Sequence, residues 1–108
     1  MTRLPLIPAL RAVAERVVWF KEPDAALADP LHFLAHVMTF GTPEDIAAVR
    51  AVVPREAFVE TLDHAPPGIF DPRSWAYWNL VLVNRFPAPP LPTRVGLRLL
   101  LDRVPAAR

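Results

Sequence analysis

The sequence predicts an all-α fold, a compact bundle of five to six short helices. Its 108 residues include 14 prolines but only 3 glycines, and 53% of them are hydrophobic, too many for a disordered chain. Three prolines follow a helix-capping residue, in the pairs Asp29-Pro30, Thr42-Pro43 and Asp71-Pro72. Proline suits the first position of a helix, because its missing N–H would have no partner there, and Asp or Thr before it caps the next N–H groups. Each pair also opens a stretch with helical spacing of apolar residues, so the prolines indicate helix starts.

Residues 9–20 are expected to form the first helix. Leu10, Val13, Val17 and Phe20 recur there at helical spacing and share one face. The last four residues of this stretch, two valines followed by two aromatic residues, also fit an extended segment. The first helix is therefore predicted to pack through one apolar face. Whether its last four residues are helical or extended stays open.

The second expected helix, residues 30–40, is apolar around most of its circumference. Only His32, His36 and Thr39 form a narrow polar stripe on it. The fifth expected helix, residues 72–84, is apolar on nearly all sides as well. A helix of this kind is surrounded by other elements. The second and fifth helices are therefore predicted to be central in the bundle.

The third and fourth expected helices are residues 43–52 and 54–64. The third carries Glu44 and Asp45 in its first turn, where the helix dipole favours negative charge. The fourth follows a proline and has apolar residues on one face and acidic residues on the other. Both are therefore expected to pack around the central pair.

A proline-rich segment, residues 86–92, follows the fifth helix. It favours the extended and semi-rigid polyproline II conformation. We expect it to connect a helical core domain, residues 1–85, to a basic amphipathic arm, residues 93–108, whose sixth helix starts near residue 93 and carries Leu101 in its apolar stripe. This stripe either folds back onto the core or binds another molecule.

The composition excludes several classes of protein. The chain has no cysteine, so it holds no disulfide, thiol nucleophile or cysteine-ligated metal. No apolar run approaches the roughly 18 residues of a transmembrane helix, and the start lacks the features of a signal peptide. Ser74 is the only serine and the glycines are isolated, which leaves no material for a serine nucleophile or a phosphate-binding loop. We therefore expect a cytoplasmic protein that is not an enzyme and binds no cofactor.

Three histidines raise the alternative of a metal site. His32 and His36 lie one helical turn apart, so both imidazoles could reach one ion, with His64 as the only other histidine. The zinc-protease pattern needs a glutamate directly after the first histidine, and Phe33 stands there. A polar stripe on an otherwise apolar helix accounts for the pair more simply. No metal site is assigned, and metal binding by the three histidines stays open.

Charge is unevenly distributed along the chain. From residue 85 to the end there are five arginines and one acid, a net charge of +4. Arg94 and Arg98 lie one turn apart in the expected sixth helix, as contacts to a phosphate backbone require. This pattern supports two alternatives, an arm that binds an acidic partner protein and a small helical DNA-binding regulator.

Residues 70–80 are the most distinctive stretch, with three aromatic residues within one helical turn. Trp75 and Trp78 share a face and are expected in the core. Arg73 and Tyr77 point elsewhere, and Arg and Tyr are enriched at binding hot spots. These two are therefore expected to contact a partner.

The motifs Gly41-Thr42-Pro43-Glu44-Asp45 and Arg73-Ser74-Trp75-Ala76-Tyr77-Trp78, in this order, resemble a family of small helical bacterial proteins. Members of that family are encoded beside nucleotidyltransferase toxins of the abortive-infection type. The resemblance covers about residues 19–82. It implies an antitoxin or accessory partner that binds the toxin stoichiometrically. The residues expected to contact the partner are Arg73, Tyr77, Arg94, Arg98 and Leu101, while homo-oligomerisation stays open.

Overall fold

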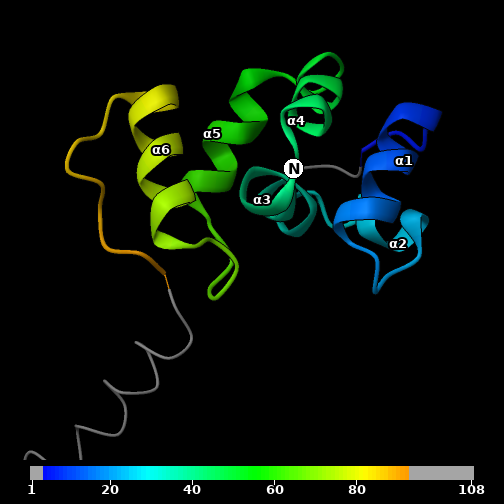
Figure 1. The fold of residues 1–108 in the computed structure, drawn as a ribbon, viewed down its shortest axis with the longest axis horizontal. Helices are drawn as coiled ribbons and strands as arrows, with labels where there is room; N and C mark the ends of the chain where they lie inside the picture. Colours follow the sequence, from blue (N-terminus) through cyan, green and yellow to red (C-terminus); the bar gives the residue numbers. More distant parts are fainter. Residues whose placement is uncertain (1–3, 93–108) are drawn as a thin grey trace, which may run out of the picture.

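The computed structural model describes residues 4–92, which form six helices packed into one bundle (Figure 1). The helices are α1 (Pro8–Val17), α2 (Pro23–Leu27), α3 (Pro30–Phe40), α4 (Pro43–Arg50), α5 (Arg55–Asp63) and α6 (Pro72–Val83). No strand occurs between residues 4 and 92, so the predicted all-α class is confirmed. The helix expected from residue 93 onward lies outside the described residues, and so do Arg94, Arg98 and Leu101.

Proline is the first residue of every described helix except α5, which begins directly after Pro54. Two of the predicted caps form. The hydroxyl of Thr42 accepts a hydrogen bond from the N–H of Asp45, and Oδ1 of Asp71 accepts one from the N–H of Ser74. Asp29, in contrast, makes no side-chain cap hydrogen bond at the start of α3. The fixed φ angle of proline therefore starts α3 without help from that carboxylate.

The N-terminal part of the fold differs from the prediction in two ways. The first helix ends at Val17, and the short helix α2 follows where the sequence predicted none. Because a proline disfavours helical geometry in the residue before it, the chain leaves the helix before Pro23 and turns. Trp19 and Phe20 lie in this turn, and Phe20 is 53% exposed, so its assignment to the inward face of the first helix was wrong.

Helix α3 occupies the centre of the bundle, as predicted. It packs against all five other helices, and Figure 1 shows it between the α1–α2 pair on one side and the α5–α6 pair on the other. Phe33, Leu34, Ala35 and Val37 on α3 have no exposed surface. The nearly all-apolar circumference of this helix is thus explained by its contacts with all five other helices.

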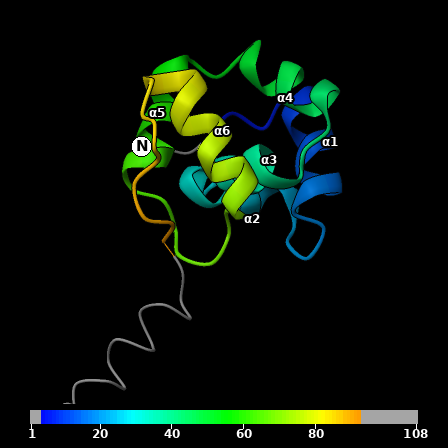
Figure 2. The same ribbon diagram turned by 60° about the vertical axis from the view of Figure 1, so that its left-hand side comes forward.

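Helix α6 is buried on one face only. The expectation that it is a second central helix is therefore confirmed for its inner face and wrong for its outer face. It packs on α3 and α5 through Trp75 and Trp78, while Tyr77, Leu80 and Val81 are 45–54% exposed. Figure 2 shows α6 on the outside of the bundle. The outer face of α6 therefore presents apolar side chains that no described element covers.

The two tryptophans of α6 hold the helix in place through their indole N–H groups. Nε1 of Trp78 donates to the carbonyl oxygen of Met38 over 2.8 Å. That carbonyl lies in the last turn of α3, where a helix leaves its carbonyls without backbone partners. In a continuing helix this carbonyl would accept from the N–H of Thr42, but that N–H donates to the side chain of Asp45 instead. Trp78 therefore satisfies a buried acceptor and joins α6 to α3.

The proline-rich segment 86–92 lies against the helical domain. Nε1 of Trp75 donates to the carbonyl oxygen of Pro89 over 2.7 Å, and the N–H of Gly68 donates to that of Pro92 over 3.2 Å. Ala88 and Leu91 pack on the core, and the segment runs beside α6 in Figure 1. Residues 86–92 thus form part of the packed structure rather than standing away from it.

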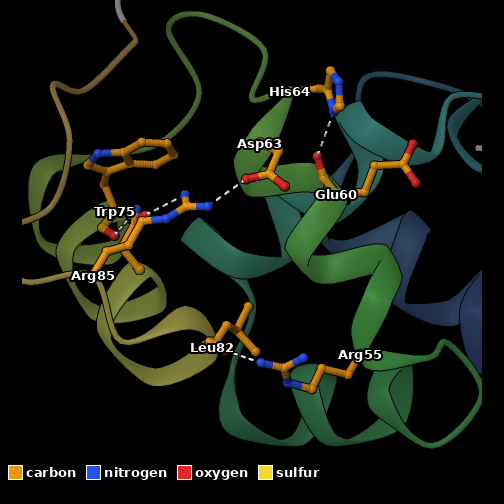
Figure 3. Close-up of polar contacts among 8 residues, drawn as sticks. Arg55, Glu60, Asp63, His64, Trp75, Leu82 and Arg85 are labelled. Atoms are coloured by element: carbon orange, nitrogen blue, oxygen red, sulfur yellow. Dashed lines mark hydrogen bonds and ion pairs between the residues drawn. The ribbon is translucent and has the colours of Figure 1, made fainter.

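Polar contacts fix α6 against α5 (Figure 3). Arg55 at the start of α5 donates to the carbonyl oxygen of Leu82 in the last turn of α6. Arg85, just after α6, donates to Asp63 over 2.8 Å and to the side chain of the buried Asn79 over 3.3 Å. A guanidinium at the C-terminal end of a helix both satisfies a free carbonyl and interacts favourably with the helix dipole. These contacts set the orientation of α6.

Candidate protein-binding groove

A groove of about 540 Å³ lies between the C-terminal end of α3, α4 and the first half of α6. Its apolar part is lined by Met38, Ile46 and Trp78. Arg50 of α4 and Arg73 of α6 also line it. We refer to this hollow as the α3–α4–α6 groove. It combines an apolar surface with two guanidinium groups that come from different helices.

The structure brings together Arg73 and Tyr77, the two described residues that the sequence predicted as partner contacts. They lie one turn apart on α6 and both line the groove. Tyr77 is 54% exposed, and its ring packs edge-on against Trp78, with 5.1 Å between the ring centroids. The buried Trp78 thus positions an exposed phenol at the groove. The role of Arg73 and Tyr77 in binding stays a prediction.

Arg50 is a groove residue that is not among the partner contacts predicted from the sequence. It ends α4, where a basic residue is usual because it complements the helix dipole. Nothing within one turn of Arg50 distinguishes it from any other surface arginine. Only the packing of α3 against both α4 and α6 brings it to the same groove as Arg73.

The arginines of residues 4–92 fall into two groups. Four of them have partners: Arg11 pairs with Glu15, Arg16 with Asp45, and Arg85 with Asp63, while Arg55 binds a helix carbonyl. Arg50 and Arg73 make no hydrogen bond or ion pair with any residue in this part of the chain. Both of these arginines line the groove, and none of its described lining residues is acidic. The groove therefore carries positive charge that the described fold does not neutralise.

The helix N-termini beside the groove are already capped. In α4, Thr42 and Asp45 exchange side-chain and backbone hydrogen bonds of 3.1 and 3.2 Å in a capping box. In α6, Oδ1 of Asp71 accepts a 2.7 Å hydrogen bond from the N–H of Ser74. These N–H groups are the ones that bind phosphate at an open helix N-terminus. The positive character of the groove thus comes from its guanidinium groups.

Gly41 allows the close turn from α3 into α4 at one end of the groove. A Cβ atom at this position would lie 2.6 Å from the carbonyl oxygen of Val37. The φ angle of Gly41 is −70°, which any residue adopts, so the need for glycine is one of space. A side chain here would push α3 and α4 apart and change the groove.

A second surface, the aromatic patch, combines the exposed Trp19, Phe20 and Phe40 with the half-buried His32 and the buried His36. Neighbouring rings in it have centroids 4.2–6.1 Å apart. Trp19 is 77% exposed and Phe40 is 63% exposed, and a hollow of about 380 Å³ lies among these side chains. The aromatic residues at the end of the first expected helix were the sequence signal for this surface, but the prediction placed Phe20 in the core.

The histidines do not form the three-ligand site considered from the sequence. The rings of His32 and His36 are adjacent, with centroids 4.2 Å apart. His64 ends α5, where its Nδ1 lies 3.3 Å from the carbonyl oxygen of Glu60. Within residues 4–92, no group of three or more His, Cys, Asp or Glu side chains is arranged to hold a metal ion. The histidine pair therefore belongs to the aromatic patch.

Comparison with known proteins gives no family model, curated protein or solved structure that matches this sequence. None of the helices between residues 4 and 92 has the length and apolar character needed to cross a lipid bilayer.

Proposed function

We propose that the protein is a non-catalytic binding protein that acts by stoichiometric contact with another protein. The observation that carries this proposal is the meeting of Arg50, Arg73 and Tyr77 at one groove, with both arginines unpaired in the described fold. Arginine and tyrosine contribute most strongly to binding when they flank a pocket from which water is excluded. The groove places both residue types beside an apolar hollow that a bound partner would cover.

The resemblance seen in the sequence supports a particular partner. Its two distinctive segments, residues 41–45 and residues 73–78, both contribute lining residues to the groove, from opposite helices. The segments that carry the resemblance thus also build the candidate binding surface. We therefore propose a role as antitoxin or accessory partner of a nucleotidyltransferase toxin in the bacterial cytoplasm.

The polar groups at the groove suit binding rather than reaction. Two guanidinium groups, the phenol of Tyr77 and the hydroxyls of Thr39 and Ser74 line it. Arginine stays protonated at physiological pH and cannot act as a general base. The proposed protein therefore neutralises or positions its partner through contact alone.

Co-expression of the full chain with the product of the adjacent gene tests this function. We expect a stable complex with the wild-type chain, measured by pull-down and size-exclusion chromatography. Combined Arg73→Glu and Tyr77→Ala substitutions should abolish it. The matched control is Arg11→Glu, which reverses an exposed arginine on α1 and should leave the complex intact. Absence of a wild-type complex, or equal complex formation by all variants, would contradict the proposal.

The alternative, a DNA-binding regulator that uses Arg94 and Arg98, makes a different prediction. Phosphate contacts give affinity that falls steeply with salt. A gel-shift assay with duplex DNA across salt concentrations separates the two functions. Salt-sensitive DNA binding that is lost in the Arg94→Ala, Arg98→Ala double variant would favour the DNA-binding regulator. Absence of a gel shift at low salt would exclude it.

A further inference from the structure

We infer that the α3–α4–α6 groove recognises a short acidic segment of a partner protein. Carboxylates of that segment pair with Arg50 and Arg73, and an apolar side chain beside them packs on Met38, Ile46 and Trp78. This inference rests on the proposed function only in that the ligand is a protein segment. It does not depend on which protein supplies the segment.

The charge of the groove selects an anionic ligand. Arg50 and Arg73 are the two arginines without a partner in residues 4–92, and the groove has no acidic residue among its described lining side chains. A carboxylate can accept two parallel hydrogen bonds from one guanidinium, so each arginine can hold one acidic side chain in a defined orientation. Two arginines on different helices therefore favour a segment with two separated acids.

The apolar part of the groove selects an anchor residue between those acids. Met38 and Trp78 are each only 3% exposed, and the indole N–H of Trp78 is already bonded to the carbonyl oxygen of Met38. A ligand side chain can therefore pack on this apolar surface but finds no free hydrogen-bond donor at the indole of Trp78. A volume of about 540 Å³ has room for one or two large side chains with their backbone. The fitting ligand is an acidic segment with a leucine or an aromatic residue as anchor.

The same geometry disfavours a phosphate group or a nucleic-acid backbone. Phosphate is usually bound by free N–H groups at helix N-termini, and at the starts of α4 and α6 the N–H groups of Asp45 and Ser74 already donate to the side chains of Thr42 and Asp71. A row of backbone phosphates also needs more cations than the two that line this groove. Singly charged carboxylates over an apolar surface match the groove better.

Selection from a phage-displayed library of random dodecapeptides on the immobilised full chain tests the inference. We expect enriched peptides to contain two or more acids around a leucine or aromatic residue. Measured by fluorescence anisotropy, their affinity should fall at least about tenfold in the Arg50→Glu and Arg73→Glu variants, and as much when the acids of the peptide become glutamine. Arg11→Glu is the matched control and should change the affinity less than about twofold.

Several results would overturn the inference: no enriched peptide, enrichment without an excess of acids, or the same peptides selected by a variant that carries both Arg50→Glu and Arg73→Glu. Duplex DNA that displaces the peptides and binds more tightly would do so as well, in favour of a nucleic-acid ligand. The Arg50→Met and Arg73→Met variants, checked by circular dichroism, provide a second pair in case charge reversal impairs folding.

This test separates the inference from the proposed function, because the library is independent of the adjacent gene. If acidic peptides bind the groove but the adjacent gene product does not bind the protein, the inference stands and the proposed function fails. If the adjacent gene product binds the wild-type chain and loses binding in the Arg73→Glu, Tyr77→Ala variant, but no acidic peptide is enriched, the proposed function stands and the inference fails.

Discussion

Nε of Arg16 on α1 donates a 3.1 Å hydrogen bond to Oδ1 of Asp45, the third residue of α4. The other carboxylate oxygen of Asp45 accepts the N–H of Thr42, so one side chain both caps α4 and joins it to α1. Asp45 is 4% exposed. Burial by itself raises the pKa of this carboxyl, but the hydrogen bonds and charge of Arg16 and the contacts with Thr42 together bring it below its ordinary value of 3.8.

This pair predicts a specific loss of stability in acid. The folded-state pKa of Asp45 is lower than the unfolded-state value, so its contribution is fully present above about pH 4 and is lost as pH falls through the folded-state pKa. Asp45→Asn should reduce the free energy of unfolding at neutral pH by about 1–3 kcal/mol and flatten this acid dependence. Urea unfolding at neutral and acid pH measures both effects. An unchanged pH dependence in the variant would contradict the assignment.

Trp78→Phe should destabilise the fold through one lost hydrogen bond. The substitution keeps an aromatic ring but leaves the buried carbonyl oxygen of Met38 without its donor. We expect a loss of about 1–3 kcal/mol in the free energy of unfolding, measured by urea titration. Leu80→Ala on the exposed face of the same helix is the control and should change stability by less than about 0.5 kcal/mol. Equal losses in the two variants would show that the indole contact does not hold α6.

Gly41 and Gly68 should respond differently to substitution by asparagine. At Gly41 space is limiting, because a Cβ would meet the carbonyl oxygen of Val37, so Ala and Asn should both destabilise by about 1–3 kcal/mol. At Gly68 the limit is the backbone, whose φ angle is 82°, and Asn adopts this region more easily than Ala. In thermal unfolding of the four variants, Asn should be less destabilising than Ala at position 68 and no better than Ala at position 41. Rescue at position 41 would refute the steric explanation.

Arg50 and Arg55 form a matched pair of arginines with different predicted roles. Arg55 satisfies a carbonyl at the end of α6, so Arg55→Met should lower the free energy of unfolding by about 1–2 kcal/mol. Arg50 has no partner in the described chain, so Arg50→Met should leave stability within about 0.5 kcal/mol of wild type. Chemical unfolding decides between these outcomes. Comparable destabilisation by both variants would assign Arg50 a structural role.

The aromatic patch should tolerate polar substitution. Trp19 and Phe40 are largely exposed, so Trp19→Ser and Phe40→Ser should change the free energy of unfolding by less than about 0.5 kcal/mol and reduce binding of an apolar dye. Phe33→Ser is the control for a core position and should unfold the protein, because Phe33 has no exposed surface. A large loss of stability at Trp19 would mean that the patch is part of the core.

The elements that the sequence predicted correctly depend on local chemistry. Pro30, Pro43 and Pro72 start helices because their own ring geometry suits the first helical position. The nearly all-apolar circumference of residues 30–40 led directly to the central place of α3. Helix α2 escaped prediction because five residues are too few to show a period.

The candidate site could be predicted only in part. Arg73 and Tyr77 were recognisable because they share one helix and lie one turn apart. Arg50 could not be linked to them, because its own surroundings in the sequence resemble any helix end. The proline-rich segment likewise predicted a stiff spacer, and only the hydrogen bond from Trp75 to Pro89 shows where it lies.

The sequence by itself thus determined that the prolines start short helices and that α3 is central in the bundle. Caps, proline geometry and apolar periodicity act within one or two turns, and these signals are complete in the chain itself. The tertiary structure alone decided that Arg50 and Arg73 line one groove and that both lack a partner in the described fold. Such a meeting depends on how α4 and α6 pack on α3, and this packing joins segments that are distant from one another in the sequence.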